Sequence, residues 1–129
     1  MSWAEIREML RGGVTFGAHT QTHPMLTAVT PDRARAEIAG SRAELAQALG
    51  RPIQLFSYPH GKYDATSRSI VEQTGYSGAC TTRAGMNSLA TSKFELRRTE
   101  VRGTDSLMRF VLGLWLGDDH LPPRRRRQK

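Results

Sequence analysis

Two histidines four residues apart, His19 and His23, are the side chains of this sequence best suited to chemistry. Each imidazole offers a ring nitrogen, and at this spacing both can converge on one divalent cation. The pair directly follows the apolar run Val14–Ala18, which predicts a buried strand, and Pro24 restricts the exit of the loop. This placement favours a metal site, although a threonine-rich surface loop without metal would show the same spacing.

A second candidate is the turn Pro59-His60-Gly61, which follows another apolar run, Ile53–Tyr58. Backbone N–H groups in a turn bounded by proline and glycine can point into a cleft and stabilise an oxyanion. The alternative is an ordinary turn against which the neighbouring aromatic side chains pack. Taken alone, the turn favours this second interpretation.

Capping residues and hydrophobic periodicity indicate helices that alternate with short apolar strands. Helices are expected between Ser2 and Gly12, between Thr30 and Gly50, between Asp64 and Gly75, and from Asp105 onward. Strands are expected over residues 14–18, 53–58, 76–82 and 94–101. The apolar residues of the last helix that are expected to face the core are Leu107, Phe110, Val111 and Leu114.

This alternation predicts an α/β fold, a parallel sheet or partial (β/α) barrel with helices outside and functional loops at the carboxyl ends of the strands. Both histidine-bearing loops fall at that end. The pattern begins on a helix that follows no strand, which would leave a sheet edge exposed. We therefore expect the fold to lack its first strand. A single domain over residues 1–117 is consistent with a length of 129 residues and a hydrophobic content of 38%.

The net charge of +7 comes largely from the end of the chain, where Arg124–Arg127 and Lys129 supply five positive charges. Pro122 and Pro123 precede them and prevent a helix from continuing. Residues 118–129 are therefore predicted to form a basic, disordered and solvated tail. Binding to a specific nucleic acid would depend on this tail alone and is not predicted.

The composition predicts a soluble chain with no membrane span. Charged residues in the first expected helix interrupt any apolar run of signal-peptide length, so the chain as written is expected to be cytoplasmic. The single cysteine, Cys80, has no partner for an internal disulfide and is expected to be a buried strand residue.

Residues 17–26 read Gly-Ala-His-Thr-Gln-Thr-His-Pro-Met-Leu, and residues 57–61 read Ser-Tyr-Pro-His-Gly. The first segment resembles the metal-binding His-[Ser/Thr]-x-x-His segment of the polysaccharide deacetylase family, also called NodB homology or carbohydrate esterase family 4. The second resembles that family's Tyr-Pro-Tyr-Gly motif, and residues 75–82 and 96–99 follow in the family's order. The resemblance extends over residues 2–116.

This resemblance implies a hydrolase of carbohydrate metabolism that acts on carbon–nitrogen bonds other than peptide bonds. His19 and His23 would bind a divalent metal, most commonly zinc, which polarises the acetamide carbonyl and activates water. An N-acetyl group on a polysaccharide or oligosaccharide would then be released as acetate. The backbone N–H of His60 would help to stabilise the oxyanion. The residues expected to line the sugar groove are Tyr58, Pro59 and Tyr63.

Several departures from the family's pattern limit this expectation. The family's Thr-Phe-Asp-Asp-Gly motif, which supplies the catalytic base and a third metal ligand, has no counterpart, so we expect an N-terminally truncated domain whose motif lies upstream of Met1. The late Leu-x-His motif, a source of general acid, has none either, because His120 lies in a different context. Asp118 and Asp119 have the wrong order and position to replace the missing aspartates. Ser57 stands where many members have an arginine.

Two functions are consistent with these features. The first is a metal-dependent deacetylase; with two imidazoles and no carboxylate, the isolated chain is expected to hold a metal weakly and to lack a catalytic base. The second is a non-catalytic module that binds glycans or a partner. Family members usually act on extracytoplasmic polysaccharides, which contrasts with the location expected for this chain.

Overall fold

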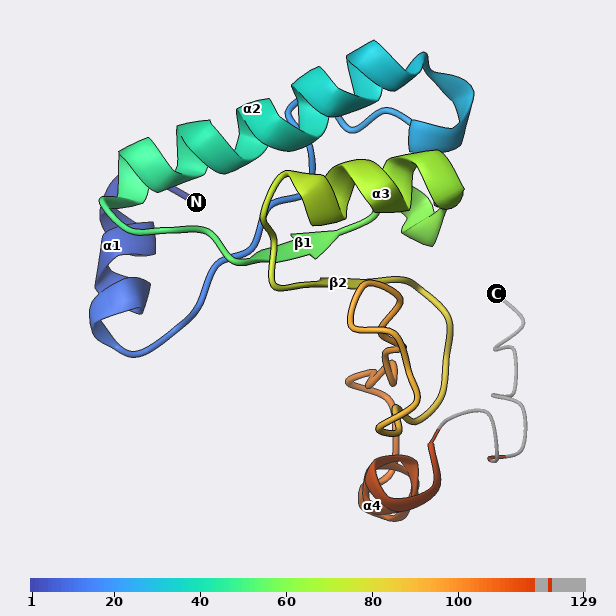
Figure 1. Ribbon diagram of the computed structural model, residues 1–129. Coiled ribbons are helices and arrows are strands. Elements are labelled where there is room, and N and C mark those ends of the chain that lie inside the picture. The colour runs from blue at the N-terminus through green and yellow to red at the C-terminus, as the bar shows by residue number, and fades with distance from the viewer. Residues whose placement is uncertain (118–120, 122–129) are drawn as a thin grey trace, which may run out of the picture.

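Helices and short strands alternate in the computed structural model of the chain, which describes residues 1–117 and residue 121 (Figure 1). The α-helices are α1 (Trp3–Arg11), α2 (Pro31–Leu49), α3 (Ala65–Gln73) and α4 (Leu107–Leu116). The strands are β1 (Leu55–Ser57) and β2 (Gly78–Cys80), and the short 3-10 helices are η1 (Leu26–Ala28) and η2 (Pro59–Gly61). The helices follow each other in the order predicted from the sequence.

Local capping groups determine where the first three helices begin. At α1, Ser2 Oγ accepts a hydrogen bond from the Glu5 N–H at 3.3 Å, and the Glu5 carboxylate accepts one from the Ser2 N–H at 2.6 Å. This reciprocal pair is a capping box. Thr30 caps α2, which ends at Gly50 in the left-handed conformation with φ 64°. Asp64 caps α3 with its side chain. These boundaries confirm the sequence predictions.

The sheet is parallel, as predicted, but its strands are shorter than expected. β1 and β2 pair directly, and single parallel bridges extend the sheet at Ala18 beside β1 and at Leu96 beside β2. The strands predicted over 14–18 and 94–101 are therefore reduced to one bridged residue each. At the first of them, the Val14 N–H donates to the Met9 carbonyl of α1 at 3.0 Å, so this N–H is not available to a neighbouring strand.

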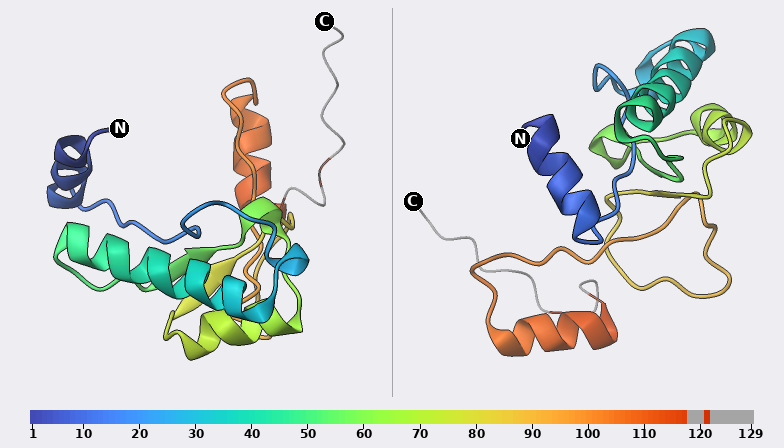
Figure 2. Two further views of the ribbon diagram at one scale, coloured as in Figure 1. Left: turned by 90° about the horizontal axis from the view of Figure 1, so that it is seen from above. Right: turned by 90° about the vertical axis from the view of Figure 1, so that its left-hand side faces the viewer.

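α2 and α3 pack against each other and lie on the same side of the sheet, as Figures 1 and 2 show from different directions. Ile38 of α2, Val71 of α3 and Phe56 of β1 belong to the buried core between these layers. Leu55, the neighbour of Phe56 on the opposite face, is 45% exposed. Helices over one face of a parallel sheet define an α/β fold. A barrel that lacks its first strand stays a prediction.

Arg42 of α2 is hydrogen-bonded to two other segments of the chain. Its guanidinium donates to the carbonyls of Ile53 at 2.9 Å, Thr74 at 2.6 Å and Gly75 at 3.1 Å. The same group lies 5.4 Å from the centre of the Tyr76 ring. These contacts connect α2 with the segment that enters β1 and with the end of α3.

α4 stands apart from the layer formed by α2, α3 and the sheet (Figures 1 and 2). Its N-cap is Ser106, whose side chain accepts from the Arg109 N–H at 3.2 Å, so the predicted cap at Asp105 is one residue early. The buried residue of α4 is Gly113, so the prediction that its inner apolar side chains are buried is wrong. These side chains are between 39% and 77% exposed: Leu107, Phe110, Val111 and Leu114.

Within residues 1–117 and 121, no helix is both long enough and apolar enough to cross a lipid bilayer. Cys80, expected to be a buried strand residue, lies in β2 and is partly buried. Except for residue 121, the predicted tail over 118–129 lies outside the described residues, and so do Asp118, Asp119 and His120.

Candidate functional site

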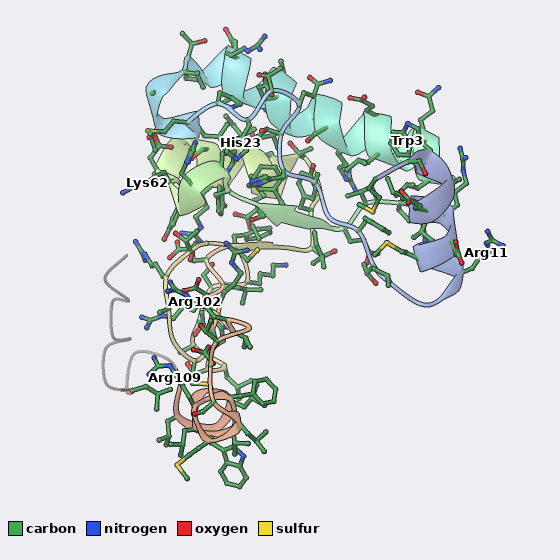
Figure 3. The ribbon with its side chains drawn as sticks, turned by 180° about the vertical axis from the view of Figure 1, so that it is seen from behind. Trp3, Arg11, His23, Lys62, Arg102 and Arg109 are labelled. Atoms are coloured by element: carbon green, nitrogen blue, oxygen red, sulfur yellow. The ribbon has the colours of Figure 1, made fainter. Side chains whose placement is uncertain are left out.

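The rings of His19 and His23 converge in the loop between the first sheet segment and α2. Their Nε2 atoms are 3.1 Å apart, and their ring centres are 4.8 Å apart at an interplanar angle of 67°. Both side chains are exposed, and Figure 3 labels His23 near the turn that precedes Lys62. The two histidines that the sequence singled out are therefore brought together with their distal nitrogens facing each other.

This arrangement fits two ligands of one metal ion. Zinc binds imidazole nitrogen at about 2.0–2.1 Å in tetrahedral geometry, which separates two such nitrogens by about 3.3 Å. The observed separation of 3.1 Å differs little from that value. Both rings could bind a common cation after only a small movement.

A hydrogen bond to the backbone determines the tautomer of His19. Its Nδ1 lies 2.6 Å from the carbonyl oxygen of Ser57 at the end of β1. Because a carbonyl oxygen can only accept, Nδ1 carries a proton, and in the neutral ring Nε2 then has the lone pair that a metal would bind. Histidine ligands of metals are commonly oriented by such a bond from their second nitrogen. β1 therefore positions His19 although it supplies no ligand itself.

The backbone adopts an uncommon conformation at three positions of this site. Thr20, His23 and His60 have φ values of 65°, 58° and 55°, and they are the non-glycine residues with positive φ in the described part of the chain. A left-handed conformation costs a residue with a side chain about 1–2 kcal/mol. Such residues cluster at functional sites, where surrounding contacts hold them in place.

His60 adds a third imidazole close to the pair. Its ring centre is 4.6 Å from that of His23, with the rings nearly perpendicular at 72°. The residue lies in the η2 turn, where Gly61 follows with φ 67°. A Cβ atom at Gly61 would lie 2.5 Å from the Thr82 backbone nitrogen, so only glycine fits there. The turn is thereby held against the chain that leaves β2. The oxyanion role of the His60 N–H stays a prediction.

Two of the three residues expected to line a sugar groove are buried. Tyr58 is 1% exposed and donates from its hydroxyl to the Phe94 carbonyl at 3.1 Å, and Pro59 is also fully buried. Both residues therefore pack in the core of the described chain, and their predicted part in a sugar groove stays a prediction. Tyr63 is partly buried and stacks on Tyr58, with the two ring centres 4.9 Å apart. The Arg83 guanidinium lies 5.3 Å from the centre of the Tyr63 ring. Its role in substrate binding stays a prediction.

Glu37 of α2 is a site residue that the sequence analysis missed. Its carboxylate is buried and accepts hydrogen bonds from the N–H groups of Gln21 and Thr22, between the two histidines. A signal was present, since Glu37 lies three residues after Ala34 and directly before Ile38 on the buried side of the helix. A charged residue within such a stripe needs partners from elsewhere in the fold.

The pKa of Glu37 reflects two opposed effects. Burial by itself raises this pKa, because it disfavours the charged form. Hydrogen bonds from the Thr22 side chain and from the N–H groups of Thr22 and Gln21, together with the charge of Arg33, outweigh burial and hold the pKa below its ordinary value. Glu37 is therefore ionised at neutral pH.

In the described part of the chain, the histidine pair is not joined by a third side chain placed to bind the same metal ion. Among residues 1–117 and 121, no group of three or more His, Cys, Asp or Glu side chains is arranged to hold a metal ion. This part of the chain therefore supplies two ring nitrogens and no adjacent carboxylate.

The fold and the paired histidines define an α/β protein with a candidate metal site at the carboxyl ends of its parallel strands. The sequence profile of the family described as "Polysaccharide deacetylase" matches residues 1–79. The chain belongs to this family, which confirms the resemblance seen in the sequence.

Individual relatives agree with this assignment. YxkH of Bacillus subtilis strain 168, whose name places it among the polysaccharide deacetylases, is 29% identical over 97 residues, which are 75% of this chain and 35% of that protein. The solved structure of the Streptococcus pyogenes deacetylase PplD in complex with acetate is 28% identical with a TM-score of 0.77, covering 81% of this chain and 46% of that one. A Bacillus cereus polysaccharide deacetylase is 25% identical with a TM-score of 0.76, covering 86% and 35%. The chain thus spans less than half the length of these relatives.

Proposed function

We propose that this chain takes part in the metal-dependent hydrolysis of N-acetyl groups on a carbohydrate polymer, with His19 and His23 as metal ligands. In this reaction the amide C–N bond breaks, water oxygen bonds to the carbonyl carbon, and acetate and a free amine result. The observation that carries the proposal is the 3.1 Å approach of the two Nε2 atoms. The family of the chain and the acetate found with PplD support the reaction class.

Each residue of the site has a separate part in this proposal. His19 and His23 hold the cation, and the Ser57 carbonyl keeps the His19 lone pair directed toward it. When bound, a divalent ion such as zinc supplies a Lewis acid for the acetamide carbonyl. The N–H of His60, in the turn beside His23, stabilises the negative charge that develops on the carbonyl oxygen. Tyr63 contributes an aromatic surface for a sugar ring.

The experiment measures acetate release from an N-acetylated chito-oligosaccharide by the purified chain, with zinc and after chelation. A zinc-dependent release that is lost in His19→Ala and in His23→Ala would support the proposal. Gln73→Ala is the control, because it removes a side chain whose hydrogen bonds are with Arg35 and Ser69 and not with the histidines. Release that is unaffected by both site substitutions would contradict the assignment of the ligands.

The second candidate is a non-catalytic module that binds glycans or a partner. It is favoured by one observation, namely that the described residues place no carboxylate beside the histidine pair to accept a proton from water. It predicts that the chain binds the oligosaccharide, measured by calorimetry, without releasing acetate at any zinc concentration. Acetate release that requires zinc would exclude it.

A further inference from the structure

We propose that Glu37 is the positioning residue of this site: it binds no metal, but it holds the loop from His19 to His23 in the conformation that lets both rings share a cation. The part of this inference that concerns the shared cation rests on the proposed function. The part that concerns the shape of the loop is independent of it.

Three of the four contacts of Glu37 are with the loop, and the fourth is with Arg33 of the same helix. Oε2 accepts from the Gln21 N–H and from the Thr22 N–H, each at 2.8 Å. Oε1 accepts from the Thr22 hydroxyl at 2.6 Å and pairs with the Arg33 guanidinium at 2.6 Å. An ionised carboxylate has about four acceptor sites, and these four donors occupy them. The side chain is 1% exposed, so water does not compete for them.

The two N–H groups held by Glu37 lie at the middle of the loop, between its two left-handed residues. Thr20 precedes them with φ 65° and His23 follows with φ 58°. Across this segment the His23 ring faces the His19 ring, with their Nε2 atoms 3.1 Å apart. A second bond closes the same turn, since the His23 N–H donates to Thr20 Oγ1 at 3.1 Å. The uncommon conformation persists only where such contacts compensate for it.

The neighbours of Glu37 on α2 have a different role. Ala34 and Ile38 pack in the hydrophobic core, and Ile38 is fully buried. Loss of Glu37 is therefore expected to release the loop while α2 stays packed. Loss of volume at Ile38 is expected to weaken the core while the loop keeps its hydrogen bonds.

The test compares Glu37→Ala, Glu37→Gln and the control Ile38→Val. Zinc affinity is measured by competition with a chromophoric chelator, and folding by circular dichroism. Glu37→Ala is expected to weaken zinc binding about 10- to 100-fold, as is usual for groups that orient metal ligands. Glu37→Gln keeps one acceptor for the two N–H groups and is expected to restore part of the affinity. Ile38→Val is expected to lower the melting temperature and leave the zinc affinity unchanged.

A second measurement needs no metal. In the metal-free chain, nuclear Overhauser effects between the His19 and His23 rings report their approach, and hydrogen exchange reports the protection of the Gln21 and Thr22 amides. Both signals are expected to be present in the wild type and in Ile38→Val, and to be lost in Glu37→Ala.

The outcomes separate this inference from the proposed function. A folded Glu37→Ala variant with wild-type zinc affinity and an intact ring contact would overturn the role of Glu37. If the wild type binds no zinc, the proposed metal site fails, and the ring contact alone decides whether Glu37 shapes the loop. If Glu37→Ala does not fold, Glu37→Gln decides: a weakened ring contact supports the inference, and a wild-type contact with wild-type exchange overturns it.

Discussion

Replacing Gly61 by alanine tests how closely the η2 turn is held against the chain that leaves β2. Gly61 has φ 67°, and an added Cβ would lie 2.5 Å from the Thr82 nitrogen and in closer contact with Thr82 Oγ1. The backbone atom cannot move aside without disturbing the edge of the sheet. The substitution is therefore expected to displace the turn and the His60 ring that it carries next to His23.

The magnitude follows from two separate costs. The left-handed conformation costs alanine about 1–2 kcal/mol relative to glycine, and the clash with Thr82 adds about 1–3 kcal/mol, as is typical of overpacking. Gly61→Ala is therefore expected to lower the free energy of unfolding by about 2–5 kcal/mol. Gly50→Ala is the matched control, since Gly50 has φ 64° and nothing within 4 Å of its added Cβ. It is expected to cost about 1–2 kcal/mol.

The assay is urea unfolding of the wild type and both variants, followed by circular dichroism at 25 °C. The difference between the two variants isolates the clash and is expected to be about 1–3 kcal/mol, a large part of a typical stability of about 5–15 kcal/mol. Equal losses in the two variants would refute the close approach of the turn to Thr82. They would also remove the argument that the turn fixes the position of His60.

His19→Ala is expected to abolish zinc binding in a chelator competition assay. Because the ring is exposed, the substitution should change the free energy of unfolding by less than about 0.5 kcal/mol. An unchanged zinc affinity would contradict the role of His19 as a ligand. Arg42→Met is expected to cost about 3 kcal/mol in urea unfolding, because it removes two partly buried hydrogen bonds from a charged donor, worth about 1.5 kcal/mol each. Arg35→Met, which removes an exposed contact with Gln73, should change stability by less than about 0.5 kcal/mol, so similar losses would argue against an anchoring role of Arg42. The pKa of Glu37 is lower in the folded chain than in the unfolded chain, where it is about 4.3. Ionised Glu37 therefore stabilises the fold above pH ~4.3, and this stabilisation is lost as the pH falls through the folded pKa. Urea unfolding over this acid range should therefore show a flatter pH dependence for Glu37→Gln than for the wild type, and parallel curves would disprove the linkage.

Features that depend on near neighbours in the chain could be predicted from the sequence. Ser2, Thr30 and Asp64 start helices because a side-chain oxygen accepts from an N–H within the first turn. Gly50 ends α2 because glycine adopts positive φ at little cost. The short motifs around His19 and His60 were sufficient to indicate the family, since the residue types and their order are written in the sequence itself.

Features that depend on residues far apart in the chain could not be predicted in this way. The hydrogen bond from the Tyr58 hydroxyl to the Phe94 carbonyl joins residues 36 positions apart, and no local pattern indicates it. The apolar side of α4 was expected to be buried, because periodicity indicates an apolar face and not what covers it. The outer strands were expected to be longer, because strand length depends on a partner's backbone as well as on apolar content.

The sequence by itself determined where the first three helices begin, the family and the two histidines four residues apart. Only the tertiary structure decided that the rings of His19 and His23 face each other, that His60 lies beside them, and that Glu37 reaches the loop from α2. The physical reason is the range of the interactions involved. A cap or a left-handed glycine acts within a few residues, whereas a buried carboxylate finds its partners only after the helix has packed onto the sheet.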